Sequence, residues 1–169
     1  MVRIKPKERL FPLTRSRNGA DNKRPMECTL ALVADAANHE EGGKLNILGA
    51  FDQVYTDEFP YVLPQMFVVV RLIANPSEFG RTKELELVLH DQDGIMVGQP
   101  IKAKGKVPTP TGGGQARMEL ILRMNNVPFE KPGDYAISVL VSGDQKASIR
   151  LGVLKRPAKK KRKGKSSGK

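Results

Sequence analysis

Four candidate metal ligands fall within seven residues of the chain. They are Asp35, His39, Glu40 and Glu41, and carboxylates beside a histidine could bind zinc or a hard cation. The surrounding residues, AANHEEGG, are polar and end in two glycines, which is typical of a turn. Because exposed acidic turns are common, we favour a solvated turn over a metal site, with no metal bound.

A second acidic motif, Asp91-Gln92-Asp93-Gly94, resembles the start of a calcium-binding loop. Such a loop also needs an acidic residue eleven positions after its first aspartate, and this chain has Lys102 there. Gly94 can adopt the positive φ that a tight turn requires. We therefore expect a turn between two strands at this motif.

Nucleophilic catalysis and phosphate-loop chemistry have little support. The sequence lacks Gly-x-Ser-x-Gly, and its histidines fall in the polar turn (His39) and on the outer face of an expected strand (His90). Cys28 begins the first expected strand, where a small core residue is the ordinary interpretation. Gly112-Gly113-Gly114 leads into a strand rather than a helix, and Gly105-Lys106 lacks a following hydroxyl residue. We expect no enzyme activity and no cofactor.

Basic residues are concentrated at the two ends of the chain. Residues 1–25 carry a net charge of +6 and residues 155–169 carry +9, whereas residues 26–154 carry −4. This density of cations suits the neutralisation of phosphates, although a basic end that only improves solubility is the alternative. No aromatic residue lies in 155–169, so base stacking and sequence readout are not expected there. The predicted polyanion-binding residues are Lys155, Arg156, Lys159, Lys160, Lys161, Arg162, Lys163, Lys165, Arg15, Arg17, Lys23 and Arg24.

Between the basic ends, apolar and polar residues alternate with the period of two that β-strands show. Turn motifs recur at intervals of about 8–12 residues, which is typical of two packed sheets, and no long amphipathic helix is expected. The fold class we predict is all-β, a two-sheet antiparallel β-sandwich of seven to eight strands. The expected strands are 29–35, 45–53, 65–74, 84–91, 117–124, 134–142 and 146–154, with a weaker pair inside 95–107.

These patterns divide the chain into three parts. We predict a flexible basic N-terminal arm at 1–25, the β-sandwich at 26–154 and a disordered Lys/Arg-rich tail at 155–169. Neither end can bury enough apolar surface to offset the entropy lost on ordering. The single cysteine fits a reducing compartment, and no apolar run approaches the ~18 residues of a membrane-spanning helix. We expect a soluble cytoplasmic protein without a membrane partner.

Three segments carry a resemblance to a known family. They are ALVADAANHEEGGKLNILGAFDQVY (31–55), FPYVLPQMFVVVRL (59–72) and PGDYAISVLV (132–141). In these segments the chain resembles a family of uncharacterised bacterial domains of unknown function. The resemblance covers most of 26–154 and implies an immunoglobulin-like or related β-sandwich of bacterial or phage origin. It implies no catalytic residues, and both basic ends fall outside it.

The preferred function is a non-enzymatic binding or assembly module. In this hypothesis the basic ends contact nucleic acid or another polyanion without sequence specificity, and the sandwich offers a surface to a protein partner. The first alternative is a structural component of a phage or other multi-subunit particle. A metal-dependent enzyme that uses Asp35, His39 and Glu40 is the least favoured class. The sequence leaves open the protein partner, the kind of nucleic acid and the oligomeric state.

Overall fold

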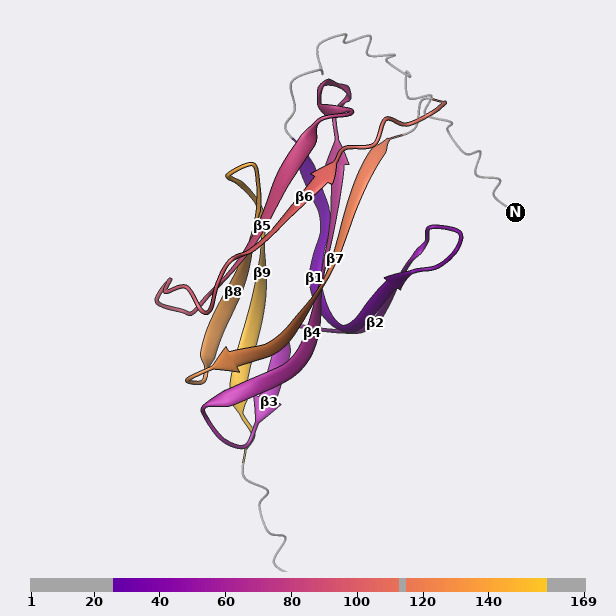
Figure 1. The fold of residues 1–169 in the computed structure, drawn as a ribbon. Helices are drawn as coiled ribbons and strands as arrows, with labels where there is room; N and C mark the ends of the chain where they lie inside the picture. The colour runs from indigo at the N-terminus through magenta and orange to yellow at the C-terminus, as the bar shows by residue number, and fades with distance from the viewer. Residues whose placement is uncertain (1–25, 113–114, 158–169) are drawn as a thin grey trace, which may run out of the picture.

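The computed structural model describes residues 26–112 and 115–157, which form a β-sandwich of nine strands. Strands β2-β1-β4-β7 form a four-stranded sheet, and strands β3-β9-β8-β5-β6 form a five-stranded sheet packed against it (Figure 1). The predicted all-β, two-sheet fold is confirmed, with one more strand than the upper expectation. The strands are β1 (Glu27–His39), β2 (Leu45–Phe51), β3 (Gln53–Thr56), β4 (Tyr61–Ala74), β5 (Thr82–His90), β6 (Ile101–Lys106), β7 (Ala116–Phe129), β8 (Gly133–Val141) and β9 (Asp144–Lys155).

Several strands extend beyond the predicted bounds. β1 continues to His39, so the predicted turn at 36–43 is wrong in its first half. β7 continues to Phe129 because it pairs with β4 along the whole length of both strands, from Tyr61 opposite Phe129 to Ala74 opposite Ala116. The expected strand pair within 95–107 is a single strand, β6, preceded by one isolated bridge between His90 and Met96.

The predicted strand at 45–53 divides between the two sheets. β2 pairs antiparallel with β1, and after one bend at Asp52 the chain continues as β3 beside β9. The β3–β9 pair is parallel, whereas the other pairs of described strands are antiparallel. Strands that change sheets through a bend are common at the corners of sandwiches, and an alternation pattern does not reveal them.

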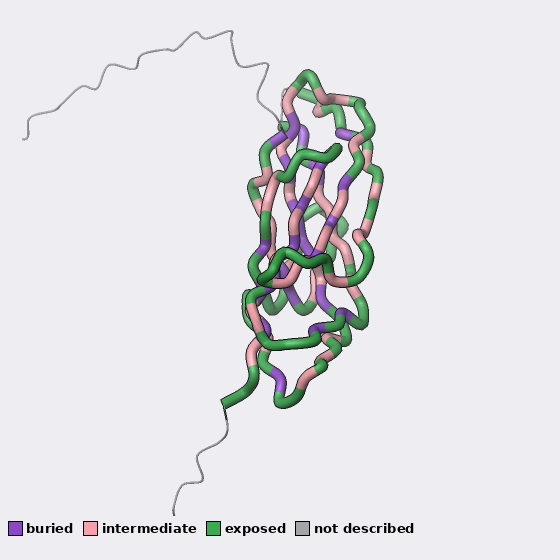
Figure 2. The backbone as a smooth tube through the Cα atoms, turned by 90° about the vertical axis from the view of Figure 1, so that its left-hand side faces the viewer, coloured by how far each residue is buried: buried purple, intermediate pink, exposed green. Residues whose placement is uncertain are grey.

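The core lies between the inner faces of the two sheets. Leu85, Leu87 and Leu89 face inward from β5 as predicted, and they are at most 5% exposed. Each buried side chain of this size contributes roughly 1.5–3 kcal/mol through the removal of apolar surface from water. Figure 2 shows buried positions alternating with less buried ones along the strands, while the loops at both ends are exposed. In the two described ranges, no helix has the length and apolar character to span a membrane.

The hairpin of β1 and β2 turns back over the outer face of the four-stranded sheet. Leu30 of β1 lies beside Arg71 of β4, which lies beside Glu119 of β7. In a straight strand, His39 would lie roughly 30 Å from this row of residues. Its imidazole instead contacts Glu119, so β1 must bend sharply between Leu30 and His39. Figure 1 shows the hairpin projecting from the side of the sandwich, with its tip rising back along it.

Candidate functional site

A hollow of about 660 Å³ lies between the tip of the β1–β2 hairpin and the outer face of the four-stranded sheet. We call it the hairpin hollow. It is open to solvent, and most of its side chains are charged. The hairpin and the sheet both line it, with His39, Gly42, Gly43, Lys44, Leu45, Arg71, Arg117 and Glu119.

Glu119 is the centre of the polar contacts in the hollow. Its Oε1 accepts a hydrogen bond from Nε of Arg71, and its Oε2 lies 2.6 Å from Nε2 of His39. Burial acts to raise the pKa of Glu119, but the hydrogen bonds from His39 and Arg71 outweigh it and lower the pKa below the ordinary value of 4.5. Glu119 therefore stays ionised at neutral pH and fixes both partners.

Arg117 places a second guanidinium group at the hollow. It lies opposite Ile73, so it is a diagonal neighbour of Arg71 on the outer face. Diagonal neighbours have Cα atoms about 7–8 Å apart, within reach of long side chains. In the part of the chain that the structure describes, no carboxylate lies within 4.0 Å of the Arg117 guanidinium.

The structure separates the candidate metal ligands of the sequence. Asp35 lies within β1, four residues before the strand ends at His39, and it faces the Gly49 region of β2. His39 instead contacts Glu119, a residue that is distant in the sequence. Within 26–112 and 115–157, no group of three or more His, Cys, Asp or Glu side chains could hold a metal ion.

The acidic motif at residues 91–94 forms the predicted turn. Oδ1 of Asp91 accepts hydrogen bonds from the N–H groups of Asp93 and Ile95, at 3.0 and 2.9 Å. The bond from Ile95 is the main reason that the pKa of Asp91 lies below its ordinary value, with Lys131 adding to the effect against the cost of desolvation. The carboxylate of Asp91 therefore serves the turn itself.

A family model matches residues 29–154, and its description is a family of unknown function, DUF6941. The chain belongs to this family. Membership confirms the resemblance to an uncharacterised domain family, and it brings no activity with it. No curated protein matches the chain in sequence.

Among solved structures, this DUF6941 domain is similar to one described as Pseudomonas fluorescens alkylpurine DNA glycosylase AlkC bound to DNA containing an abasic site analog. The two share 10% sequence identity with a TM-score of 0.44. The match covers 76% of this chain and 30% of that chain, so the DUF6941 chain spans less than a third of that protein. A likeness this weak does not bear on function.

Glu119, Arg71, Arg117 and Lys44 were not predicted as site residues from the sequence. Arg71 carried a signal, because it interrupts the apolar run from Met66 to Ala74 in a central strand. Arg117 and Glu119 alternate with core residues and are typical of a solvated strand face. No neighbouring sequence pattern indicates that the β1–β2 hairpin contacts Arg117 or Glu119.

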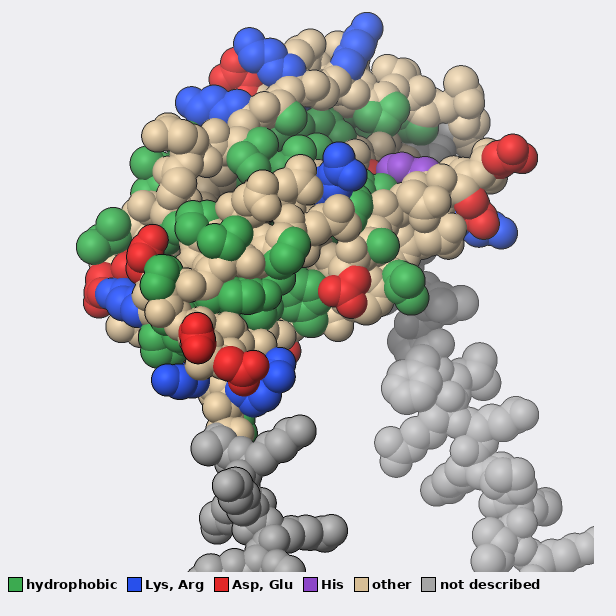
Figure 3. Space-filling view, turned by 60° about the horizontal axis from the view of Figure 1, so that its bottom comes forward, with side chains coloured by type: hydrophobic (Ala, Val, Ile, Leu, Met, Phe, Trp, Pro, Cys, Tyr) green, Lys and Arg blue, Asp and Glu red, His purple; other side chains and the backbone are tan. Residues whose placement is uncertain are grey.

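Two of the predicted polyanion-binding residues of the DUF6941 chain lie in the described part. Lys155 is the last residue of β9 and pairs with Thr56. The N–H of Arg156 donates to the carbonyl of Thr56, and its guanidinium lies 3.5 Å from Asp57. Acidic and basic side chains lie together near the end of the described chain (Figure 3). The others lie outside the described residues, namely Lys159, Lys160, Lys161, Arg162, Lys163, Lys165, Arg15, Arg17, Lys23 and Arg24.

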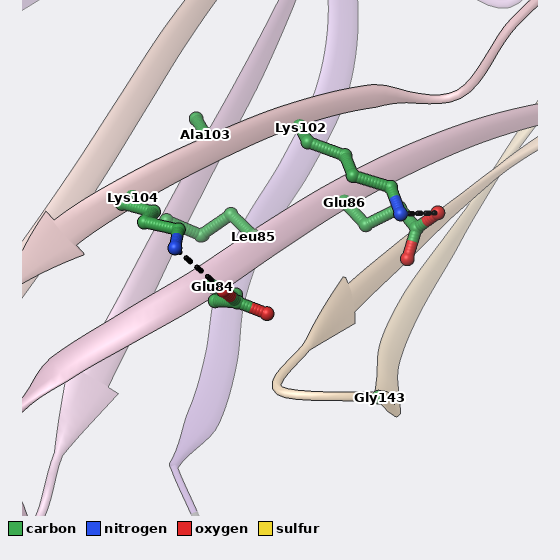
Figure 4. A pocket seen from close by; sticks show the side chains of 7 residues that line it. All are labelled: Glu84, Leu85, Glu86, Lys102, Ala103, Lys104 and Gly143. Carbon is green, nitrogen blue, oxygen red and sulfur yellow. Dashed lines mark ion pairs between the residues drawn. The ribbon is translucent and has the colours of Figure 1, made fainter.

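A second hollow lies along the edge strand β6, where lysines alternate with small or apolar residues. Nζ of Lys104 lies 2.9 Å from Glu84, and Nζ of Lys102 lies 3.6 Å from Glu86 (Figure 4). The hydrogen bond from Lys104 is the main cause that lowers the pKa of Glu84. These charges pair with one another across two strands, and lysines on an edge strand oppose pairing with another chain. Among the described residues, each of the four charged side chains that line this hollow is paired with another of them, so none is left to favour a ligand.

Proposed function

We propose that this DUF6941 protein is a non-enzymatic binding module that attaches to nucleic acid, or a similar polyanion, through its basic ends. The distribution of charge carries the proposal, because residues 1–25 hold +6 and residues 155–169 hold +9 on a body of −4. Lysines and arginines that neutralise phosphates release condensed counterions, and this release drives association. The ends of the described chain add a geometric argument.

Strand β1 begins and strand β9 ends at opposite ends of the sandwich (Figure 1). β9 alone has 12 residues, so it spans roughly 40 Å. The two basic segments are therefore attached to a rigid body at well-separated points. Such an arrangement favours simultaneous contact with two regions of one long polyanion, which raises the overall affinity without new contacts.

The salt dependence of binding to a DNA duplex tests this proposal. Each phosphate contact contributes about −0.9 to the slope of log K against log salt. Replacing Lys159, Lys160, Lys161, Arg162, Lys163 and Lys165 with glutamine removes six charges, so the slope should become less steep by up to about 5. Fluorescence anisotropy at several salt concentrations measures it. A control variant with residues 158–169 in a different order keeps the charge and should bind as the original does. Equal slopes for the glutamine variant and the original chain would overturn the proposal.

A protein partner on the body is the second part of the proposal. Leu48 and Ile95 are 71% and 63% exposed, and hydrophobic side chains are spread over the face shown in Figure 3. A protein partner, either a different chain or a neighbouring subunit of a particle, would remove these side chains from water. Light scattering at increasing concentration separates these cases, because a particle component should assemble and a binding module should stay at one mass.

A further inference from the structure

The two arginines of the hairpin hollow have more donors than the surrounding protein uses. Arg71 donates to Glu119 through Nε, and its Nη atoms make no hydrogen bond with another described residue. Arg117 has no ion-pair partner within the two described ranges. Each guanidinium group carries five N–H donors in a planar fork, a geometry that matches the oxygens of phosphate and carboxylate.

Glu119 does not neutralise this pair of arginines. Its two oxygens are occupied by Arg71 and His39, one oxygen for each partner. Lys44 adds a third cation from the hairpin, where it lies 3.3 Å from the exposed Glu40. With Glu40 counted beside Lys44, the hollow and its rim hold three cations and two carboxylates, which leaves an excess of one positive charge. This excess positive charge favours an added anion.

The remaining lining of the hollow indicates what kind of anion fits. Its volume of about 660 Å³ exceeds that of a bare ion, so a larger group can carry the charge. Leu45 is the only apolar side chain that lines it and no aromatic ring does, as far as the described residues show. Recognition there must come from the charged group rather than from stacking on a base.

We propose that the hairpin hollow binds a phosphate monoester, with Arg71 and Arg117 as the main contacts and Lys44 as a further cation. A monoester presents three unesterified oxygens and a phosphodiester only two, so a monoester offers more acceptors to two guanidinium groups. The group belongs either to a small phosphorylated molecule or to the 5′ end of a nucleic acid. This site is separate from the basic ends and stands even if they bind nothing.

The two histidines of the chain make a direct test available, since one lies in the hollow and the other in the five-stranded sheet. NMR signals of the imidazole rings report on each in the full-length protein. Inorganic phosphate, added at constant ionic strength with chloride as the balancing salt, should shift the His39 signals to saturation and leave those of His90 unchanged. Equal or unsaturated shifts of both rings would overturn the proposal.

Matched arginine variants identify the site. Arg117→Gln should weaken phosphate binding at His39 about tenfold or more, while Arg150→Gln, an exposed arginine of β9, should leave it unchanged. Unaltered His90 signals show that each variant is folded. If Arg117→Gln binds phosphate like the original chain, the assignment of the site is overturned. The basic ends are tested separately by the salt dependence of duplex binding, which Arg117→Gln should leave unchanged.

A dinucleotide with and without a 5′-phosphate distinguishes the two sources of the group. If inorganic phosphate and the 5′-phosphorylated dinucleotide shift the His39 signals to saturation at similar concentrations, the site recognises the phosphate group of any small molecule. A much tighter response to the phosphorylated dinucleotide indicates a nucleic-acid end. An equal response to the dinucleotide without the 5′-phosphate would mean that a phosphodiester suffices, and this overturns the monoester proposal.

Discussion

Nε2 of His39 lies 2.6 Å from Oε2 of Glu119, although 80 residues separate the two in the sequence. The contact joins the tip of the β1–β2 hairpin to the far strand of the same sheet. Arg71 of β4, the strand between β1 and β7, donates a hydrogen bond to the same carboxylate. Three strands of one sheet therefore contact Glu119. The shape of the hairpin hollow therefore depends on the charge of Glu119.

Glu119→Gln should reduce the stability of the fold. Glu119 is 16% exposed and accepts hydrogen bonds from two partners, and bonds to a charged group of this kind contribute about 1.5–3 kcal/mol each when they are well shielded. We expect a loss of about 1–3 kcal/mol in the free energy of unfolding, measured in urea. Glu84→Gln is the control, since it removes an exposed carboxylate from an ion pair at the sheet edge and should change stability little. Equal losses in the two variants would contradict the role given to Glu119.

The pH dependence of stability should change in the same variant. The pKa of Glu119 is lower in the folded protein than the unfolded value near 4.5. Its contribution is therefore fully present above about pH 4.5 and is lost as the pH falls through the folded pKa. The stability difference between the original chain and Glu119→Gln should shrink as the pH falls below about 4.5. A difference that stays constant down to pH 3 would mean that Glu119 does not titrate with a lowered pKa.

Gly49 should be intolerant of alanine. It has a φ of +64°, and a Cβ there would overlap Oδ2 of Asp35 and lie 2.9 Å from its Cγ. A left-handed backbone costs a residue with a Cβ about 1–2 kcal/mol, and the overlap adds to that cost. Gly49→Ala should thus lower the free energy of unfolding by more than about 1 kcal/mol.

Two variants separate the causes at Gly49. Gly42→Ala is the matched control, because nothing lies within 4 Å of its added Cβ and no positive φ constrains it. It should leave stability within about 0.5 kcal/mol of the original. Asp35→Ala combined with Gly49→Ala removes the overlap with the carboxylate group but leaves the backbone strain and the approach of 3.1 Å to Cβ of residue 35, so it should recover part of the loss. Full tolerance of Gly49→Ala would show that β2 can move away from Asp35.

The alternation of side chains predicted the sandwich well, since it depends on neighbours within one strand. Leu85, Leu87 and Leu89 face the core because every second residue of a strand points the same way, whatever its partner strand. The ends of β1 and β7 were predicted less well. Ala36 to His39 and Asn125 to Phe129 are strand because partners lie beside them, and partners are not visible in a local pattern.

The candidate site could not be predicted, because it depends on a bend. His39 reaches Glu119 only because β1 turns back on itself, close to the point where Asp35 meets Gly49. A glycine within a strand is consistent with such a bend and does not specify its direction. The sequence therefore located His39 in a polar segment and missed its contact with Glu119.

Lys104→Gln should raise the pKa of Glu84 toward its ordinary value of 4.5. The hydrogen bond and the charge of Lys104 are the two largest causes that lower this pKa, whereas Lys102 contributes only a small Coulombic effect. Lys102→Gln is thus a control with the same change of charge on the same strand (Figure 4). Carbon-13 NMR titration of the glutamate side chains measures both shifts. Because the wild-type pKa is lowered, Glu84 should bind its proton at a higher pH in Lys104→Gln than in Lys102→Gln. Equal shifts would show that the edge lysines act on Glu84 only through their summed charge, without the specific pairing at 2.9 Å.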